Sequence, residues 1–382
     1  MTEWKEYKLG EVIKTNVESI GKDYPYSKIL YLDTGSITRN NIDQYQEFEL
    51  DKAPSRAKRL VKQDDIIYSS VRPNQLHYGY ITNPANNLVV STGFVTITCN
   101  KAYIEPKFLY YYLTQENITE YLHSVAEAST SAYPSLKASD IESLYIELPP
   151  LPEQIRIASI LSSLDDKIDL LHRENKTLEA MAETLFRQWF IEEAKEDWKE
   201  GNLGDEFEFI MGQSPSGESF NEEGAGIPMY QGNADFGFRF PTKRIFTTQP
   251  TKFAEINDTL ISVRAPVGAQ NMAIERCCIG RGVAAFRYKN NSLFYSYTYY
   301  KLKSLLNEIK QYNDNGTVFG SISKSDFENL DIVIPDKDTI LNFQKQVKPI
   351  DDKIINNNNE IQTLIQTRDG LLSRLMSGEV KI

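Results

Sequence analysis

Two pairs of adjacent aspartates are the most obvious candidates for chemistry in this sequence. They are Asp165–Asp166 and Asp351–Asp352, and each pair opens the same tetrapeptide, DDKI. Carboxylate oxygens are the ligands of hard cations, so either pair could be imagined in a metal site. Both pairs, however, lie beside apolar residues at helical spacing, such as Leu164 and Ile168 in the first copy. We therefore interpret these acids as solvated residues of a helix surface or as contacts to a partner.

The other residue types that form catalytic or metal centres are scattered. None of the histidines and cysteines has the CxxC or HExxH spacing of a metal site: His77, His123, His172, Cys99, Cys277 and Cys278. The one Pro-Pro pair follows Leu148, not the Asn or Asp of an adenine methyltransferase motif, and the sequence has no GxxxxGK[ST] phosphate loop. The sequence therefore predicts no catalytic centre, and no metal or cofactor bound by this chain.

The charge balance argues against a simple nucleic-acid binder, but the charge distribution leaves room for one. The 382 residues carry 42 basic and 53 acidic side chains, a net charge of −11. Basic residues gather in short segments that can either face phosphates or form solvated surfaces: Arg56, Lys58, Arg59 and Lys62; Arg239, Lys243 and Arg244; Arg276, Arg281 and Arg287. The odd cysteine count, and a start without the apolar stretch of a signal peptide, predict a cytoplasmic protein.

Two long helices that repeat would position these residues. The segments Pro149–Phe190 and Ile334–Met376 align through DDKI without a gap. In both, apolar residues recur at alternating steps of four and three, the 3.5-residue repeat of a coiled-coil seam. The first seam is Ile157, Leu161, Leu164, Ile168, Leu171, Asn175, Leu178, Ala182, Leu185 and Trp189. The second seam is Phe343, Val347, Ile350, Ile354, Asn357, Ile361, Leu364, Arg368, Leu371 and Leu375.

The two seams predict that the helices pair antiparallel. With full overlap, the layers run from Ile157–Leu375 to Trp189–Phe343. The asparagines Asn175 and Asn357 then share one layer. A buried Asn pair fixes the register of a coiled coil at some cost in stability.

The repeat extends to both halves of the chain. Their openings, "EWKEYKLGEV" and "DWKEGNLGDEF", match, and "DDIIYSSVRP" resembles "NDTLISVRAP", which puts Arg72 and Arg264 at equivalent strand ends. The sequence thus predicts an α+β fold with a pseudo-twofold internal repeat: two similar mixed α/β domains separated by two long helices in an antiparallel coiled coil. The predicted boundaries are 1–148 and 197–335 for the domains, and 149–196 and 336–382 for the helices.

The loops differ between the halves more than the helices do. The segment Gly212–Phe238 has only a short, dissimilar counterpart around Ser27–Ser36. Recognition usually lies in loops on a rigid support. Similar scaffolds with dissimilar loops therefore suit a protein that recognises two different targets.

These residues carry a resemblance that covers essentially the whole chain. Its most specific segments are "LPPLPEQIRIASIL", "GQSPSGESFNEEGAGIPMYQGNADFG", "SVRAPVGAQNMA", "CCIGRGVAAF" and "SISKSDFENLDIVIP". Through them the chain resembles the specificity subunit of type I restriction–modification systems. The entry to the second helix, Asp336–Ile340, departs from the family pattern.

The resemblance implies a division of labour. Each domain would be a target-recognition domain that binds one half of a split site in double-stranded DNA. The helices would set the gap and hold two modification subunits and, through them, restriction subunits. The cofactors that the resemblance implies, S-adenosylmethionine, ATP and Mg, would belong to those partners.

Base edges in the major groove are read by Arg, Lys, Asn and Gln on loops or helix ends. The candidates in the first half are Arg56, Arg59, Arg72, Ser129, Thr130 and Tyr133. Those in the second half are Gln213, Ser214, Gln231, Asn233, Arg264, Thr317 and Phe319. For each of them a structural role, as a turn former or a strand-end arginine, competes with base reading.

Three functions remain open on the residues alone. The first is a DNA-recognition chain of a restriction–modification complex. The second is an enzyme in its own right, such as a nuclease or a self-contained methyltransferase with fused recognition domains, against which the missing motifs weigh. The third is a coiled-coil adaptor that binds only proteins, against which the two dissimilar loop sets weigh.

Overall fold

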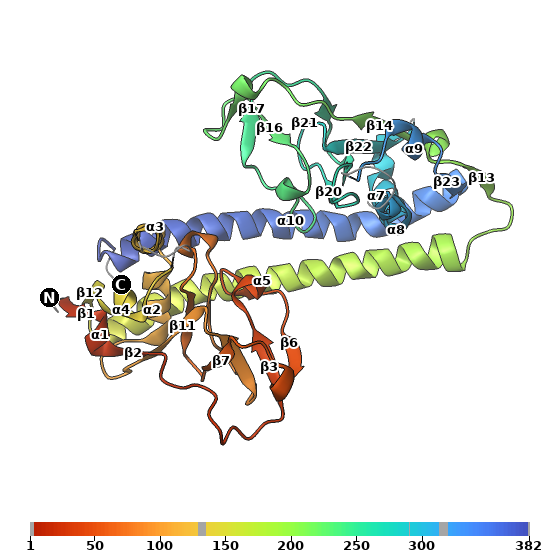
Figure 1. Cartoon of the computed structure of the whole chain (residues 1–382). Coiled ribbons are helices and arrows are strands. Elements are labelled where there is room, and N and C mark those ends of the chain that lie inside the picture. The colour runs from red at the N-terminus through yellow and green to blue at the C-terminus, as the bar shows by residue number, and fades with distance from the viewer. Residues whose placement is uncertain (1–3, 129–134, 290, 313–319, 381–382) are drawn as a thin grey trace. The chain divides into compact units, whose positions relative to one another are not determined.

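The computed structural model describes residues 4–128, 135–289, 291–312 and 320–380 (Figure 1). The chain forms two compact units, Met1–Leu170 with Glu360–Ile382, and Leu171–Asn359. Each unit contains one mixed α/β domain and a stretch of both long helices, α5 (Leu151–Arg187) and α10 (Lys337–Met376). The predicted fold class is confirmed.

The first domain contains two four-stranded sheets, ordered β6-β3-β10-β7 and β2-β11-β8-β9, and the strand pairs β1-β12 and β4-β5. Its strands are β1 (Lys5–Lys8), β2 (Ile13–Thr15), β3 (Lys28–Leu32), β4 (Ile37–Thr38), β5 (Asn41–Ile42), β6 (Gln46–Glu49), β7 (Ala57–Leu60), β8 (Ile66–Ser69), β9 (Tyr78–Tyr80), β10 (Leu88–Ser91), β11 (Phe94–Cys99) and β12 (Tyr145–Leu148). Its helices are α1 (Leu9–Val12), α2 (Pro106–Leu113), α3 (Glu116–Glu127) and α4 (Ala138–Glu142), with 3-10 turns η1 (Thr34–Ser36), η2 (Leu50–Lys52) and η3 (Pro73–Gln75).

The second domain repeats this topology. The sheet β14-β22-β19-β20 corresponds to β2-β11-β8-β9, and β17-β16-β21-β18, extended by β15, corresponds to β6-β3-β10-β7. Its strands are β13 (Lys199–Asn202), β14 (Phe207–Met211), β15 (Phe220–Asn221), β16 (Ile227–Tyr230), β17 (Ile245–Thr247), β18 (Phe253–Ala254), β19 (Thr259–Ser262), β20 (Gln270–Met272), β21 (Cys277–Ile279), β22 (Val283–Tyr288) and β23 (Asp331–Ile334). Its helices are α6 (Leu203–Glu206), α7 (Tyr295–Ser304), α8 (Leu306–Gln311) and α9 (Lys324–Glu328), with 3-10 turns η5 (Gly217–Ser219), η6 (Asn233–Asp235) and η7 (Ser292–Phe294).

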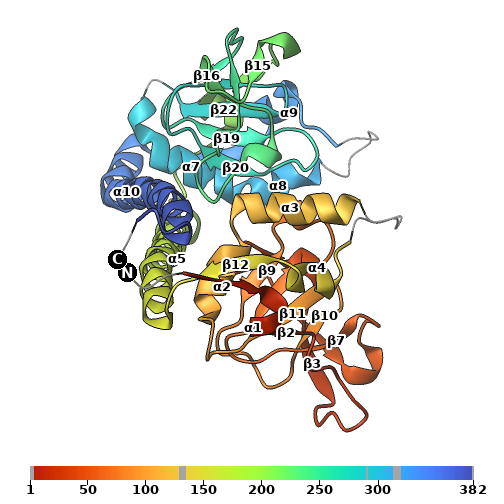
Figure 2. The same ribbon diagram turned by 90° about the vertical axis from the view of Figure 1, so that its left-hand side faces the viewer.

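Burial explains why the inner strands read as apolar runs. All four residues of β8 and all four of β19 are buried, and each strand has a neighbour on both sides. In each domain one inner pair is parallel, β10 with β3 and β21 with β16. Figure 2 shows α7 beside the sheet of β22, β19 and β20. The α7 residues Tyr297 and Tyr300 are buried in the core of the second unit.

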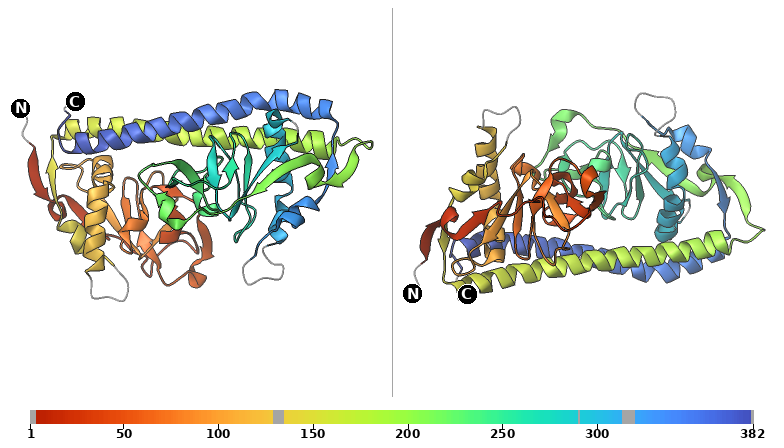
Figure 3. Two further views of the ribbon diagram at one scale, coloured as in Figure 1. Left: turned by 90° about the horizontal axis from the view of Figure 1, so that it is seen from above. Right: turned by 60° about the horizontal axis from the view of Figure 1, so that its bottom comes forward.

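The helices α5 and α10 pack side by side and antiparallel (Figure 3). In the first unit Lys167 Nζ lies 3.3 Å from Glu360 Oε1, and Asp165 Oδ1 lies 2.8 Å from Arg368 Nη1. The higher-numbered residue of α5 therefore faces the lower-numbered residue of α10, as in an antiparallel pair.

The predicted register is confirmed in the second unit. Asn357 Nδ2 donates to Asn175 Oδ1 at 2.9 Å, and both side chains are buried. At the far end of the seam, the ring centroids of Trp189 and Phe343 are 6.1 Å apart. The α-helical part of α5 ends just before Trp189, in a π turn over Gln188–Glu192.

The first aspartate of each DDKI motif attaches its domain to the helices. In the first unit, Tyr111 of α2 donates a hydrogen bond to Asp165 Oδ2 at 2.6 Å, and Arg368 of α10 donates to Asp165 Oδ1 at 2.8 Å. The side chain of Asp165 is only 29% exposed. Both carboxylate oxygens of Asp165 therefore accept hydrogen bonds within the chain, a role that the interpretation as a solvated acid or a partner contact did not include.

The second unit uses the equivalent aspartate in a fully buried ion pair. Arg239 Nη2 lies 2.8 Å from Asp351 Oδ1, and each side chain is 1% exposed. Tyr300 of α7 donates to the same carboxylate at 3.4 Å, and the guanidinium carbon of Arg239 lies 3.3 Å from the ring centroid of Tyr299. Burial alone would lower the pKa of Arg239, but the Asp351 carboxylate raises it above its usual value. The interpretation of Asp351 as a solvated surface acid is wrong, because its side chain is 1% exposed. Neither role left open for Arg239, facing phosphates or lying on a solvated surface, holds, because Arg239 is buried.

A buried glutamine in each long helix binds the aromatic helix of its domain. In the first unit, Gln154 Oε1 accepts the backbone N–H of Glu105, the residue that precedes α2, at 2.9 Å. In the second unit, Gln344 Oε1 accepts the N–H of Ser296 in α7 at 3.0 Å. The altered entry of α10 uses Asp336, which accepts the N–H of Thr339 at 2.9 Å. A hydrogen bond from Lys195 holds the pKa of the Asp336 carboxyl well below its usual range.

We predict that Asp351→Ala lowers the free energy of unfolding by about 3–5 kcal/mol, because it leaves the Arg239 charge buried without its partner. The matched control is Asp352→Ala on the same helix. Asp352 forms a 2.5 Å pair with Lys348 at side-chain exposures of 54% for Lys348 and 45% for Asp352, so its removal should cost about 0.5 kcal/mol. Denaturant unfolding of the full chain measures both values. Equal losses in the two variants would contradict the assignment.

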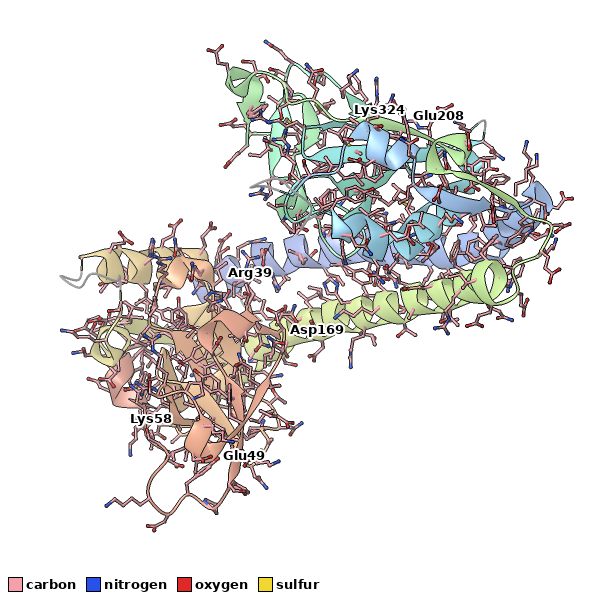
Figure 4. All side chains as sticks on the ribbon, turned by 45° about the vertical axis from the view of Figure 1, so that its right-hand side comes forward. Arg39, Glu49, Lys58, Asp169, Glu208 and Lys324 are labelled. Carbon is pink, nitrogen blue, oxygen red and sulfur yellow. The ribbon has the colours of Figure 1, made fainter. Side chains whose placement is uncertain are left out.

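We predict that stability depends on pH through Glu206, whose pKa burial raises to about 7. Its Oε1 accepts a hydrogen bond from Tyr297 at 2.8 Å. Because the folded pKa lies above the unfolded value, the stability that the neutral acid contributes is complete below about pH 4.5 and is lost as pH rises through about 7. Relative to Glu206→Gln, the wild type should lose on the order of 2–3 kcal/mol between pH 5 and 8. Glu208→Gln, at an exposed carboxyl labelled in Figure 4, is the control and should show no such trend.

Candidate nucleic-acid interface

In the second domain, several predicted residues surround one turn, Gly280–Gly282, which joins β21 to β22. The N–H of Gln213 donates to Ile279 O at 3.0 Å, and the N–H of Arg281 donates to Ser214 Oγ at 3.3 Å. The structure thus brings Gln213 and Ser214, predicted from one segment, to the edge of a turn about 70 residues later in the chain. Gln213 is exposed and Ser214 is half-buried.

Gln231 lies on the other side of this turn. The N–H of Gly280 donates to Tyr230 O at 2.8 Å, and the N–H of Gln231 donates to Asp235 Oδ2 at 2.6 Å. Asn233 opens η6 in the same loop, and both Gln231 and Asn233 are exposed. The loop therefore presents two amide side chains beside the turn.

Two glycines make the close packing of this turn possible. A Cβ at Gly282 would lie 2.0 Å from Gln231 O, and a Cβ at Gly212 would lie 2.2 Å from Gly280 O. Backbone atoms at such distances cannot yield without displacing a strand. These positions therefore require the absence of a side chain.

Arg264 lies next to the same turn. The N–H of Val263 donates to Gly282 O at 2.9 Å, and Arg264 forms a β-bridge with Ser321. Arg264 is exposed. The candidates Thr317 and Phe319 lie outside the described residues.

The first domain builds a similar edge around the turn Ser91–Gly93. The N–H of Ser70 donates to Gly93 O at 2.8 Å, and the N–H of Thr92 donates to Arg56 O at 2.8 Å. Arg56 is exposed, as is Arg72, whose backbone is left-handed with φ 47°. The candidates Ser129, Thr130 and Tyr133 lie outside the described residues.

Two details differ from the sequence interpretation. Val71 bridges Ser135 in the first domain whereas Arg264 bridges Ser321 in the second, so Arg264 corresponds to Val71 and Arg72 is one residue out of register. Arg59 is half-buried on β7, and burial lowers its pKa. Its Nε atom is buried and has no hydrogen-bond partner among the described residues.

Half of the 14 basic residues between 197 and 335 form ion pairs with acids. Besides Arg239, the ion pairs are Lys243–Glu275 at 2.6 Å, Arg244–Asp235 at 2.7 Å, Arg276–Glu255 at 3.1 Å, Arg287–Asp258 at 2.5 Å, Lys303–Glu179 at 2.5 Å and Lys324–Glu328 at 3.2 Å. Within the described ranges, Arg281 has no ion pair, and it is exposed. In the first domain, Lys58 points outward from β7 (Figure 4).

Sequence reasoning placed Arg281 only in a basic cluster and overlooked Lys252, an exposed residue just before β18. The glycines on both sides of Arg281 were a signal that could have drawn attention to it.

In the described part of the chain, no group of three or more His, Cys, Asp or Glu side chains is placed to hold a metal ion. None of the helices in those ranges combines the length and the apolar character needed to cross a membrane.

The chain matches the family model described as the type I restriction modification DNA specificity domain over residues 1–180 and again over 195–367. It is 32% identical to the type I restriction enzyme MjaX specificity subunit of Methanocaldococcus jannaschii, over 98% of this chain and 90% of that one. It is 25% identical to the HindI specificity subunit of Haemophilus influenzae over the full length of both chains. The crystal structure of a type I restriction–modification S subunit from M. genitalium shares the fold, with a TM-score of 0.60 at 20% identity over 98% of this chain and 96% of that one.

We predict that Gly282→Ala destabilises the second domain by roughly 1–3 kcal/mol, because the new methyl group collides with the backbone of Gln231. Gly217→Ala is the control: nothing lies within 4 Å of a Cβ at Gly217, so its effect should stay within about 0.5 kcal/mol. Thermal or denaturant unfolding of both variants measures the two losses of stability. A Gly282→Ala protein as stable as the control would show that the turn is looser than described.

Proposed function

This chain belongs to the type I restriction–modification DNA specificity family, and from this premise we propose that each of its two domains binds one half of a bipartite, gapped DNA target. It is a specificity subunit, the non-catalytic component of a type I restriction–modification enzyme that recognises the DNA target. We propose residues 1–148 and 197–335 as the two target-recognition domains, with the helical segments 149–196 and 336–382 as spacers.

One observation carries the proposal. The two domains share strand order and the placement of their parallel pair, yet the loops at the turns Ser91–Gly93 and Gly280–Gly282 differ. A shared scaffold suits the double helix that both half-sites share. Different loops suit the different bases of each half-site.

The exposed residues at these edges supply the chemistry. Arg56, Arg72 and Lys58 in the first domain, and Arg264, Arg281 and Lys252 in the second, can neutralise phosphates or reach base edges. Amides such as Gln213, Gln231 and Asn233 can pair with adenine. Such local cations support DNA binding by a chain whose net charge is −11.

We propose that the helices set the gap between the half-sites and hold two modification subunits, through which restriction subunits join. S-adenosylmethionine, ATP and Mg would act in those partners. The buried Asn175–Asn357 layer supports a fixed register, and a fixed register supports a fixed spacing. We also propose a cytoplasmic location, supported by three cysteines that remain free thiols.

Exchanging residues 197–335 for the same stretch of a relative with another specificity should change one half-site and leave the other intact, because each domain has its own core. The hybrid is co-expressed with the modification subunits, and methylated positions are mapped across the host genome. Exchange of residues 1–148 is the reciprocal control. A hybrid that alters both half-sites at once would rule out independent readers.

Inserting seven residues after Leu171 and seven after Asn357 should lengthen the unspecified gap and keep both half-sequences, because seven residues preserve the seam. The seam spans roughly 48 Å and would grow by roughly 10 Å, equivalent to about three base pairs. Methylation mapping gives the new gap. Four residues inserted into α5 alone should break the seam and abolish modification. An unchanged gap in the double insertion would mean that the helices do not set the spacing.

A further inference from the structure

Building on the proposed function, we infer that the residue at the centre of the turn between the two sheets determines specificity in each domain. This residue is Arg281 in the second domain and Thr92 in the first. In the second half-site, Arg281 reads a guanine.

The two residues occupy the same position of the repeated scaffold. In the first domain Phe94 pairs with Ser69, and Gly93 O accepts the N–H of Ser70 at 2.8 Å. The second domain has the same two contacts: Val283 pairs with Ser262, and Gly282 O accepts the N–H of Val263 at 2.9 Å. The residue before each of these glycines is therefore equivalent.

The backbone at this position is held while the side chain is free. The N–H of Arg281 is fixed by Ser214 Oγ, and its neighbours Gly280 and Gly282 pack against the backbone of the segment that contains Gln231. The side chain of Arg281 is exposed, and no ion pair joins it to any described residue. The N–H donors of its guanidinium are therefore available to a ligand. Because the backbone of the turn is already ordered, binding does not incur the entropic cost of ordering it.

Two other arginines of this domain, Arg276 and Arg287, are not in that state. Arg276 forms an ion pair with Glu255, and its guanidinium carbon lies 4.1 Å from the ring centroid of Phe253. Arg287 donates two hydrogen bonds to the Asp258 carboxylate. A ligand would have to compete with these partners for either arginine, whereas Arg281 needs no such exchange.

The difference between the two domains favours base reading over phosphate binding. Both half-sites have phosphates, so a position that binds phosphate should keep a cation in both domains. One position of the edge strand does so, because it holds Arg59, half-buried, in the first domain and Lys252, exposed, in the second. The next residue along each strand, Leu60 or Phe253, pairs with the residue three positions before the turn residue, Val89 or Cys278. The turn position does not, because it holds an arginine in one domain and a threonine in the other. A residue that changes with the target suits contact with bases. Arginine pairs in bidentate fashion with O6 and N7 of guanine.

The test uses the full chain co-expressed with the modification subunits of its own system, with methylated sequences mapped across the host genome. The wild type should require a guanine at one position of one half-site. Arg281→Thr should reduce the preference for that guanine over other bases on the order of ten- to hundredfold and leave every other position unchanged. Arg281→Lys should retain part of the preference, because lysine also donates to guanine O6 and N7.

Two further variants serve as controls. Arg276→Thr removes an exposed but ion-paired arginine of the same domain and should leave the recognised sequence unchanged. Thr92→Arg should alter one position in the other half-site only. The unaltered half-site reports in each case that the variant is folded and assembled.

Two results would overturn the inference alone: an unchanged sequence requirement in Arg281→Thr, or an equal loss of modification at all targets, which is the mark of a phosphate contact. A wild-type complex that modifies no bipartite target would instead overturn the proposed function, and the inference with it.

Discussion

In each unit a carboxylate of a long helix, together with a buried glutamine of a long helix, joins the domain to the helices. Asp165 accepts a hydrogen bond from Tyr111 of the first domain, and Asp351 accepts hydrogen bonds from Arg239 and Tyr300 of the second. A charge removed from water must be compensated by a partner, so the loss of either partner is strongly destabilising. The consequence reaches the loops that we propose for recognition, because Arg239 directly follows the segment Gly212–Phe238 and its carbonyl also accepts the N–H of Met272. A helix residue thus fixes one end of the segment whose amides lie beside the Gly280–Gly282 turn.

The features that could be predicted from the sequence were those that follow from the spacing of residues along the chain. The heptads of α5 and α10 placed Asn175 opposite Asn357, and the structure pairs them at 2.9 Å. The matching strand signals also indicated two similar domains. Both inferences needed only spacing along the chain, which a single sequence contains.

What could not be predicted depended on partners distant in sequence. Asp351 looked like a surface acid because its partner, Arg239, lies more than a hundred residues away and reaches it only after the domain folds. The basic cluster around Arg239 misled for the same reason, since Lys243 and Arg244 are paired with acids as well. Arg72 and Arg264 looked equivalent in the sequence, but the bridges of Val71 and Arg264 show a shift of one residue. Among the residues singled out for recognition, those around Gly280–Gly282 were brought together by backbone contacts that no spacing rule predicts.

The two aspartate contacts differ in burial, and this makes them respond differently to ionic strength. The Asp165–Arg368 pair is partly open to solvent, with side-chain exposures of 29% and 24%, whereas Asp351 and Arg239 are enclosed at 1% each. At physiological salt, mobile ions screen exposed charges over about 8 Å but act far less on buried ones. Added salt therefore weakens the helix pairing beside the first domain and leaves the attachment of the second nearly untouched. Of the two units, the first is therefore the one whose helix contact depends on ionic strength.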